Sequence, residues 1–116
     1  MLQRVRLFDG VEKKLEVYNQ QAIINYPIEF FVADECEDEE DFEFPSYISS
    51  YLRIFNERLG RQIREISLSN YAEALIVNAS VADMTFEDNG KYYYEIGFVQ
   101  SGGYEIALMF GPLIVL

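Results

Sequence analysis

The sequence predicts an all-β protein, an antiparallel β-sandwich with about seven to nine strands and at most a short helical segment. Apolar or aromatic residues recur at every second position over 92–98 and again over 104–110, and most of the residues between them are polar or small. A Gly-rich turn, Ser101-Gly102-Gly103, joins the two runs, as in a β-hairpin with one buried face. The composition agrees: the 116 residues include nine Tyr and nine Phe and are 50% hydrophobic, which suits a single domain over 1–116 with its own core.

The N-terminal third predicts three strands. Arg4–Phe8 is the first, Asp9-Gly10 is a turn signal, and Lys13–Tyr18 is the expected returning strand. Ala22–Val32 follows, and Pro27 within it predicts an edge position or a bulge, since proline removes one ladder donor. The residues expected to share one face of this strand are Ile24, Tyr26, Ile28, Phe30 and Val32.

The stretch 46–63 has two interpretations. With a period of two, it forms a strand, a turn over Asn56–Gly60 and a returning strand over Gln62–Ser67. With a period of 3.6, it forms a helix whose apolar stripe is Ile48, Tyr51, Leu52, Phe55, Leu59 and Ile63. Because Ser, Tyr, Ile and Phe favour strands, we expect strands and keep the helix as the alternative.

The remaining elements lead into the C-terminal hairpin. Ala72–Asn78 is apolar on both faces, which predicts a central strand, and Ser80–Asn89 is a connection with room for a helical turn. The core-facing residues expected in the first hairpin strand are Tyr92, Tyr94, Ile96 and Phe98. Those expected in the second are Tyr104, Ile106, Leu108 and Phe110. Pro112–Leu116 is the predicted closing strand.

Five short motifs follow one another in the second half of the chain: Leu52-Arg53-Ile54, Leu59-Gly60-Arg61, Leu75-Ile76-Val77, Gly90-Lys91-Tyr92-Tyr93-Tyr94-Glu95-Ile96 and Gly111-Pro112-Leu113-Ile114-Val115. Their order over residues 41–116 resembles the Ig-like N-terminal domain of phage baseplate upper proteins and related virion Ig-like modules. The resemblance implies an Ig-like sandwich that holds neighbouring subunits in a virion, with no cofactor and no reaction. Two departures are a longer acidic loop and a sequence that stops at the closing strand, where the family continues.

Charge and composition argue against several classes of function. A net charge of −11 opposes direct binding to nucleic acid or to anionic membranes. The absence of His excludes Ser–His and Cys–His relays, and the carboxylates around Cys36 disfavour its thiolate. The start has no apolar signal region, and no apolar run approaches the length of a membrane span. We therefore expect a protein made in the host cytoplasm that is not an enzyme.

The acidic run 34–43 is the main candidate for a binding site. Eight of its ten positions are Asp or Glu, which predicts a loop, since like charges at this density resist packing. A solvated loop, a docking strip for a basic partner, a Ca²⁺ site and mimicry of nucleic-acid phosphates are all open, although the spacing lacks the pattern of a known calcium loop. The residues expected to contact a partner here are Glu37, Asp38, Glu39 and Glu40.

Tyrosines supply the second candidate surface. Tyr47, Tyr51 and Tyr93 are expected to point outward, where they could anchor a partner or simply pack on the sheet. Tyr92, six residues after Phe86, resembles a tyrosine corner, which is a structural feature.

Two functions remain. The first is a structural protein of a bacteriophage virion, in the tail or baseplate, the neck or the capsid, assembled in many copies with other virion proteins. The second is a small acidic phage-encoded inhibitor that covers a basic nucleic-acid-binding surface of a host protein. The strand order and the tyrosine-rich faces favour the first, and the net charge of −11 favours the second.

Overall fold

The computed structural model describes residues 3–6, 12–33, 39–41, 49–58, 60–71, 74–99 and 102–116. This part of the chain forms strands joined by turns and contains no helix, so the all-β prediction is confirmed. The strands are β1 (Gln3–Arg6), β2 (Leu15–Val17), β3 (Ile23–Ala33), β4 (Glu39–Asp41), β5 (Ser49–Phe55), β6 (Gln62–Tyr71), β7 (Ala74–Ala79), β8 (Gly90–Val99) and β9 (Glu105–Val115).

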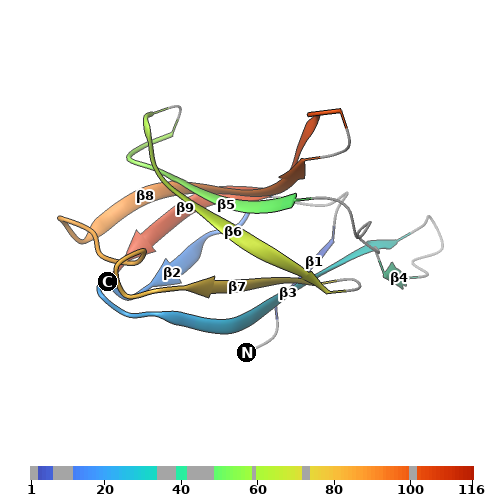
Figure 1. Ribbon diagram of the computed structural model, residues 1–116, viewed down its shortest axis with the longest axis horizontal. Coiled ribbons are helices and arrows are strands. Elements are labelled where there is room, and N and C mark those ends of the chain that lie inside the picture. The colour runs from blue at the N-terminus through green and yellow to red at the C-terminus, as the bar shows by residue number, and fades with distance from the viewer. Residues whose placement is uncertain are drawn as a thin grey trace.

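The strands form one mixed sheet that curls on itself, in the order β1-β3-β7-β6-β5-β8-β9-β2, with β4 beside β3. The curl occurs at β6, which runs diagonally between two facing layers (Figure 1). Its first part pairs with β5 as far as Leu68, and its last part, from Ser69 to Tyr71, pairs with β7. One layer therefore contains β5, β8, β9 and β2, and the other contains β7, β3, β1 and β4.

The hydrophobic core lies between the two layers. Ile54, Leu75, Ile96 and Met109 are completely buried, and they come from one layer (β5, β8, β9) and from the other (β7). This burial explains the alternation in the sequence, because successive side chains of a strand point to opposite faces and only one face meets the core. Ala74–Ala79 lies between β3 and β6, so the predicted central strand is confirmed.

The N-terminal strands pair differently from the prediction. β1 pairs with β3 and β2 pairs with β9, both in parallel, so the expected hairpin between the two segments is wrong and the sheet is mixed. Leu15 and Val17 pack against the core beside β9. Burial of these two side chains against a distant strand overrides the local turn signal.

Two bulges change which residues face the core. In β3 the register shifts between Ile23 and Tyr26, with Asn25 at a φ of 47°, so Ile24 is 77% exposed, contrary to the prediction. In β9 the shift leaves Leu108 unpaired between Ala107 and Met109. Leu108 and Met109 are both buried, and Phe110 turns to the outer face instead of the core. An inserted residue reverses the alternation downstream of it.

The stretch 46–63 forms strands where it is described. β5 and β6 are joined by a turn at 56–60, and the helical alternative is wrong for residues 49–58 and 60–63. The predicted acidic loop is partly wrong, because Glu39–Asp41 pairs with Phe31–Ala33 as β4. The rest of that run, 34–38 and 42–43, lies outside the described residues, as does the turn signal Asp9-Gly10.

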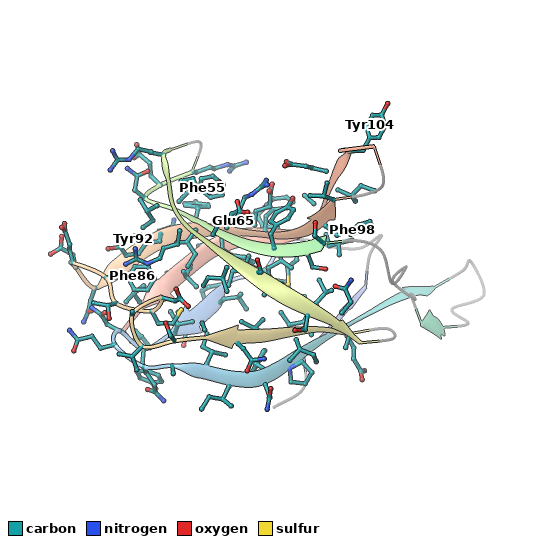
Figure 2. The ribbon with its side chains drawn as sticks, in the orientation of Figure 1. Phe55, Glu65, Phe86, Tyr92, Phe98 and Tyr104 are labelled. Atoms are coloured by element: carbon teal, nitrogen blue, oxygen red, sulfur yellow. The ribbon has the colours of Figure 1, made fainter. Side chains whose placement is uncertain are left out.

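The predicted tyrosine corner is present. The Tyr92 hydroxyl donates to the Asp88 carbonyl oxygen at 2.8 Å, and its ring lies 4.9 Å from the Phe86 ring between centroids. Figure 2 shows the two rings side by side where the 80–89 connection enters β8. The connection contains one helical turn, in which the Met84 amide donates to the Ser80 carbonyl oxygen. This corner fixes the start of β8 and thereby which of its residues face inward.

Candidate functional site

The outer face of β5, β6, β8 and β9 carries a charged cluster centred on Arg53. Its guanidinium donates to both carboxylate oxygens of Glu105, at 2.9 and 2.7 Å, and to Glu65 at 3.0 Å. A Glu95 oxygen lies 3.7 Å away. The cluster joins four strands through one side chain of which only 16% is exposed, and a bidentate pair of this kind fixes geometry as well as charge.

Tyr51 lies beneath this cluster. The guanidinium carbon of Arg53 is 3.9 Å from the centre of the Tyr51 ring, and the Tyr51 hydroxyl donates to Glu95 at 3.1 Å. Burial, reinforced by the Glu95 charge, raises the pKa of Tyr51 to about 12. The hydrogen bond from Arg53 lowers the pKa of Glu105, and the same bond raises the pKa of Arg53. The three groups with shifted pKa values, Tyr51, Arg53 and Glu105, therefore belong to one network of contacts.

These shifts predict opposite effects on stability at the two ends of the pH scale. The folded chain holds the Tyr51 proton more tightly than the unfolded chain, so stability should fall as the pH rises from about 10 to about 12. The contribution of Glu105 is present above its unfolded pKa and is lost as the pH falls through its lower folded value. Urea unfolding midpoints across this range test both. Tyr51→Phe should weaken the alkaline loss and leave the acid limb unchanged; an unchanged alkaline limb would contradict the assignment.

The same outer face carries an apolar strip, which we call the outer aromatic patch: Phe55, Tyr93, Phe110 and Pro112. Phe55, Tyr93 and Pro112 are directly opposite one another on β5, β8 and β9. Phe110 lies in the adjacent row, opposite Glu95, and is 37% exposed. Lys91 lies over the Tyr93 ring, with its Nζ 5.4 Å from the ring centre. The patch is rimmed by charge on two sides, by the Arg53 cluster and by Lys91.

The predicted contact residues are distributed unevenly. Tyr93 lies in the outer aromatic patch, whereas Tyr51 is only 4% exposed and offers a partner little surface. Glu39 and Glu40 lie on the backbone of β4, opposite Ala33 and Val32. Glu37, Asp38 and Tyr47 lie outside the described residues.

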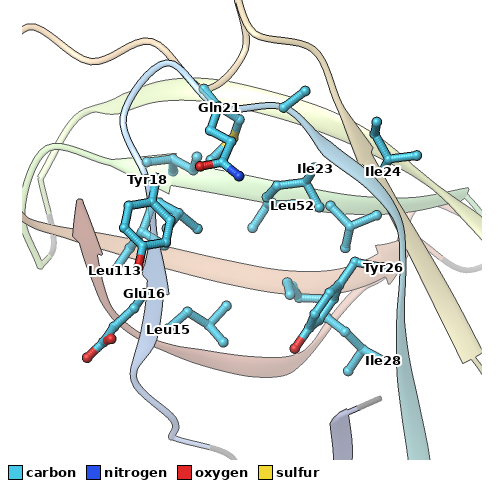
Figure 3. A pocket seen from close by; sticks show the side chains of 16 residues that line it. Leu15, Glu16, Tyr18, Gln21, Ile23, Ile24, Tyr26, Ile28, Leu52 and Leu113 are labelled. Atoms are coloured by element: carbon cyan, nitrogen blue, oxygen red, sulfur yellow. The ribbon is translucent and has the colours of Figure 1, made fainter. Parts of the chain in front are cut away.

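The second candidate site is a cleft between the layers, beside β2 and β3. It encloses a cavity of about 390 Å³. Leu15 and Val17 line it from β2, and Leu52 and Ile96 line it from β5 and β8 in the same layer. Ile23 and Tyr26 line it from β3 in the other layer. Figure 3 shows Glu16 and Tyr18 at its rim on the β2 side, and Ile24 beyond Ile23 on the β3 side. A cavity of this size with apolar walls is typical of ligand and peptide sites.

Sequence reasoning missed both the Arg53 cluster and the cleft. The sequence contained a sign of the cluster, because the predicted alternation places Arg53, Glu95 and Glu105 on the outward faces of their strands. The cleft had none, since it depends on which distant strands pair.

In the described part of the chain, no group of three or more Cys, Asp or Glu side chains is placed to hold a metal ion. Nor does any described helix have the length and apolarity needed to cross a membrane. No known protein family matches the chain, and no curated protein has a matching sequence.

Proposed function

We propose that this chain is a structural protein of a bacteriophage virion that acts through subunit contacts made by the faces of its sheet, not through catalysis. The observation that carries the proposal is the outer aromatic patch, in which three apolar side chains line up across adjacent strands. Aromatic groups flanked by charged residues are common in protein contacts. The virion setting rests on the resemblance of the strand-and-turn order to virion Ig-like modules.

An Ig-like sandwich is part of the same proposal. The two facing layers and the tyrosine corner support it. The parallel partners β1 and β2 are additions to that plan. Other virion proteins, or further copies of this chain, are the proposed neighbours.

The patch can be tested by removing two of its aromatic groups, one from β8 and one from β9. The double variant Tyr93→Ser and Phe110→Ser should keep the fold but weaken self-association, measured by light scattering across a concentration series, or incorporation into particles, by roughly tenfold or more. The matched control is Val81→Ser, which removes a 52% exposed apolar side chain from the 80–89 connection. Equal assembly of the double variant, the control and the parent chain would contradict the proposal.

The acidic run keeps its predicted role as a docking strip within this function. If the alternative function as an inhibitor holds, the purified chain binds a basic nucleic-acid-binding protein and the double variant at Tyr93 and Phe110 binds it equally well. The net charge of −11 favours that alternative, because it would draw such a partner in at low salt.

A further inference from the structure

The curled sheet does not close between β2 and the first half of β3. Within the described residues, β2 pairs only with β9, and Ile23–Pro27 pairs only with β7, because the pairing of β1 with β3 starts at Ile28. The cavity described above lies behind this gap. The fold therefore presents two sheet edges on either side of an apolar interior, which is the arrangement that accepts an added strand.

The backbone of β2 is oriented for such an addition. The Lys13 amide donates to Phe110, the Val17 carbonyl accepts from Leu116, and the Asn19 amide donates to Leu116. These odd-numbered residues thus direct their backbone polar groups toward β9. Because these groups alternate along a strand, those of Glu16 and Tyr18 point to the open side.

The cavity restricts what can enter it. Its walls are mainly apolar side chains, including the fully buried Ile54 and Ile96, while Glu16, Tyr18 and Gln21 add polar groups to the lining. A side chain that reaches the apolar part must therefore be apolar as well. The site requires apolar groups in the cavity and a backbone partner for the open edge of β2. An added strand supplies both, because its alternate side chains can enter the cavity while its backbone pairs with β2. A lipid tail would fill the cavity but would leave the edge of β2 without a partner.

The charge of the surface around the cleft further limits which strand could bind there. The charged side chains on the exposed side of 12–18 are Glu12, Lys14 and Glu16. Lys14 and Glu16 form an ion pair at 3.2 Å, so this side has an excess of one negative charge, within a chain that carries −11. A segment with basic residues at its outward positions complements this surface. We propose that the cleft binds an extended segment of a partner protein, apolar at alternate positions and basic between them, as a strand added to β2. This inference rests on the proposed function as an assembly protein and names the chemistry of its partner.

The test uses the peptide Lys-Val-Thr-Ile-Lys-Val-Thr and its rearrangement Lys-Lys-Thr-Thr-Val-Val-Ile, which has the same composition without the alternation. Calorimetry with the full chain should show binding of the first peptide and at least roughly tenfold weaker binding of the second. Hydrogen exchange at the amides of Glu16 and Tyr18 should slow by roughly tenfold or more when the first peptide is bound. Absence of binding, or equal binding of the two peptides, would overturn the proposal.

The variant Glu16→Pro removes one donor from the open edge of β2. Proline is tolerated at an edge strand whose N–H faces away from the ladder, so the fold should survive. The variant should bind the alternating peptide at least roughly tenfold more weakly, whereas Glu16→Thr, which keeps the amide, should bind it as the parent does. If Glu16→Pro unfolds, the pairing with β2 is tested instead by hydrogen exchange at the Glu16 and Tyr18 amides of the parent chain. Equal binding by both variants would overturn the pairing with β2.

Two other occupants would give different results. Binding of dodecanoate in place of the peptide would assign the cavity to lipids, and concentration-dependent protection of Glu16 without any peptide would assign it to a second copy. Either result overturns the proposal. The outer aromatic patch is unchanged in all these experiments, so their failure leaves the proposed function standing. Conversely, normal assembly of the Tyr93 and Phe110 double variant would contradict the proposed function, whereas the peptide-binding result would be unaffected.

Discussion

Tyr94→Ala should destabilise the protein by roughly 3–5 kcal/mol, the range for truncation of a large buried aromatic side chain. Tyr94 is 2% exposed, and its hydroxyl donates to the Lys13 carbonyl oxygen at 2.6 Å. Burial also raises its pKa, as expected for a phenol that must stay neutral inside the core. The side chain therefore both fills the core and ties the segment before β2 to the centre of β8. Urea unfolding gives the free energy of unfolding directly.

Tyr94→Phe is the control that separates these two roles. It keeps the ring and loses only the hydrogen bond to Lys13, so it should cost about 1 kcal/mol. A loss below about 1 kcal/mol for the Ala variant would place Tyr94 at the surface and shift the register of β8 by one residue.

Gly111→Ala should destabilise by roughly 3–5 kcal/mol, combining backbone strain with a steric clash. Gly111 has a φ of 153°, and a Cβ added there would lie 2.3 Å from the Lys13 carbonyl oxygen. That carbonyl belongs to the segment that runs along β9, and it is the acceptor for Tyr94. An added methyl group would push the segment away and break that bond.

Gly90 provides a matched comparison on the neighbouring strand. Its φ is 137°, and an added Cβ would meet nothing within 4 Å. Gly90→Ala should therefore cost only the strain, about 1–3 kcal/mol. Similar unfolding midpoints for the two variants would show that Lys13 does not pack against Gly111.

Strands with strong alternation could be predicted from the sequence, and their ends could not. Tyr92, Tyr94, Ile96 and Phe98 pack inward as predicted, because both the pattern and the core demand it. The predictions for Ile24 and Phe110 are wrong, because each lies near a bulge that inserts one residue. The prediction for Tyr104 is wrong as well, since it lies just before β9 and is 74% exposed. Asn25 carried a weak signal of the first bulge, since Asn tolerates a positive φ better than most residues.

The candidate sites were harder to predict than the strands. The outward position of Tyr93 follows from the alternation alone. The same alternation places its neighbour Phe110 in the core, so the outer aromatic patch does not follow from the sequence. The cleft was beyond prediction for a different reason: β2 borders it, β2 is placed by parallel pairing with the distant strand β9, and no local pattern specifies such pairing.

The pairing of β2 with β9 also determines when the protein can finish folding during synthesis. Leu15, Glu16 and Val17 pair with Leu113, Ile114 and Val115, and the Tyr94 bond to Lys13 spans 81 positions. A ribosome releases β2 long before the strand that holds it in place. Until β9 emerges, Leu15 and Val17 have no sheet to join, and the cleft has only one of its two walls. Contacts of such long range form slowly, so the edge of β2 that pairs with β9 stays exposed in the new chain until β9 has been made.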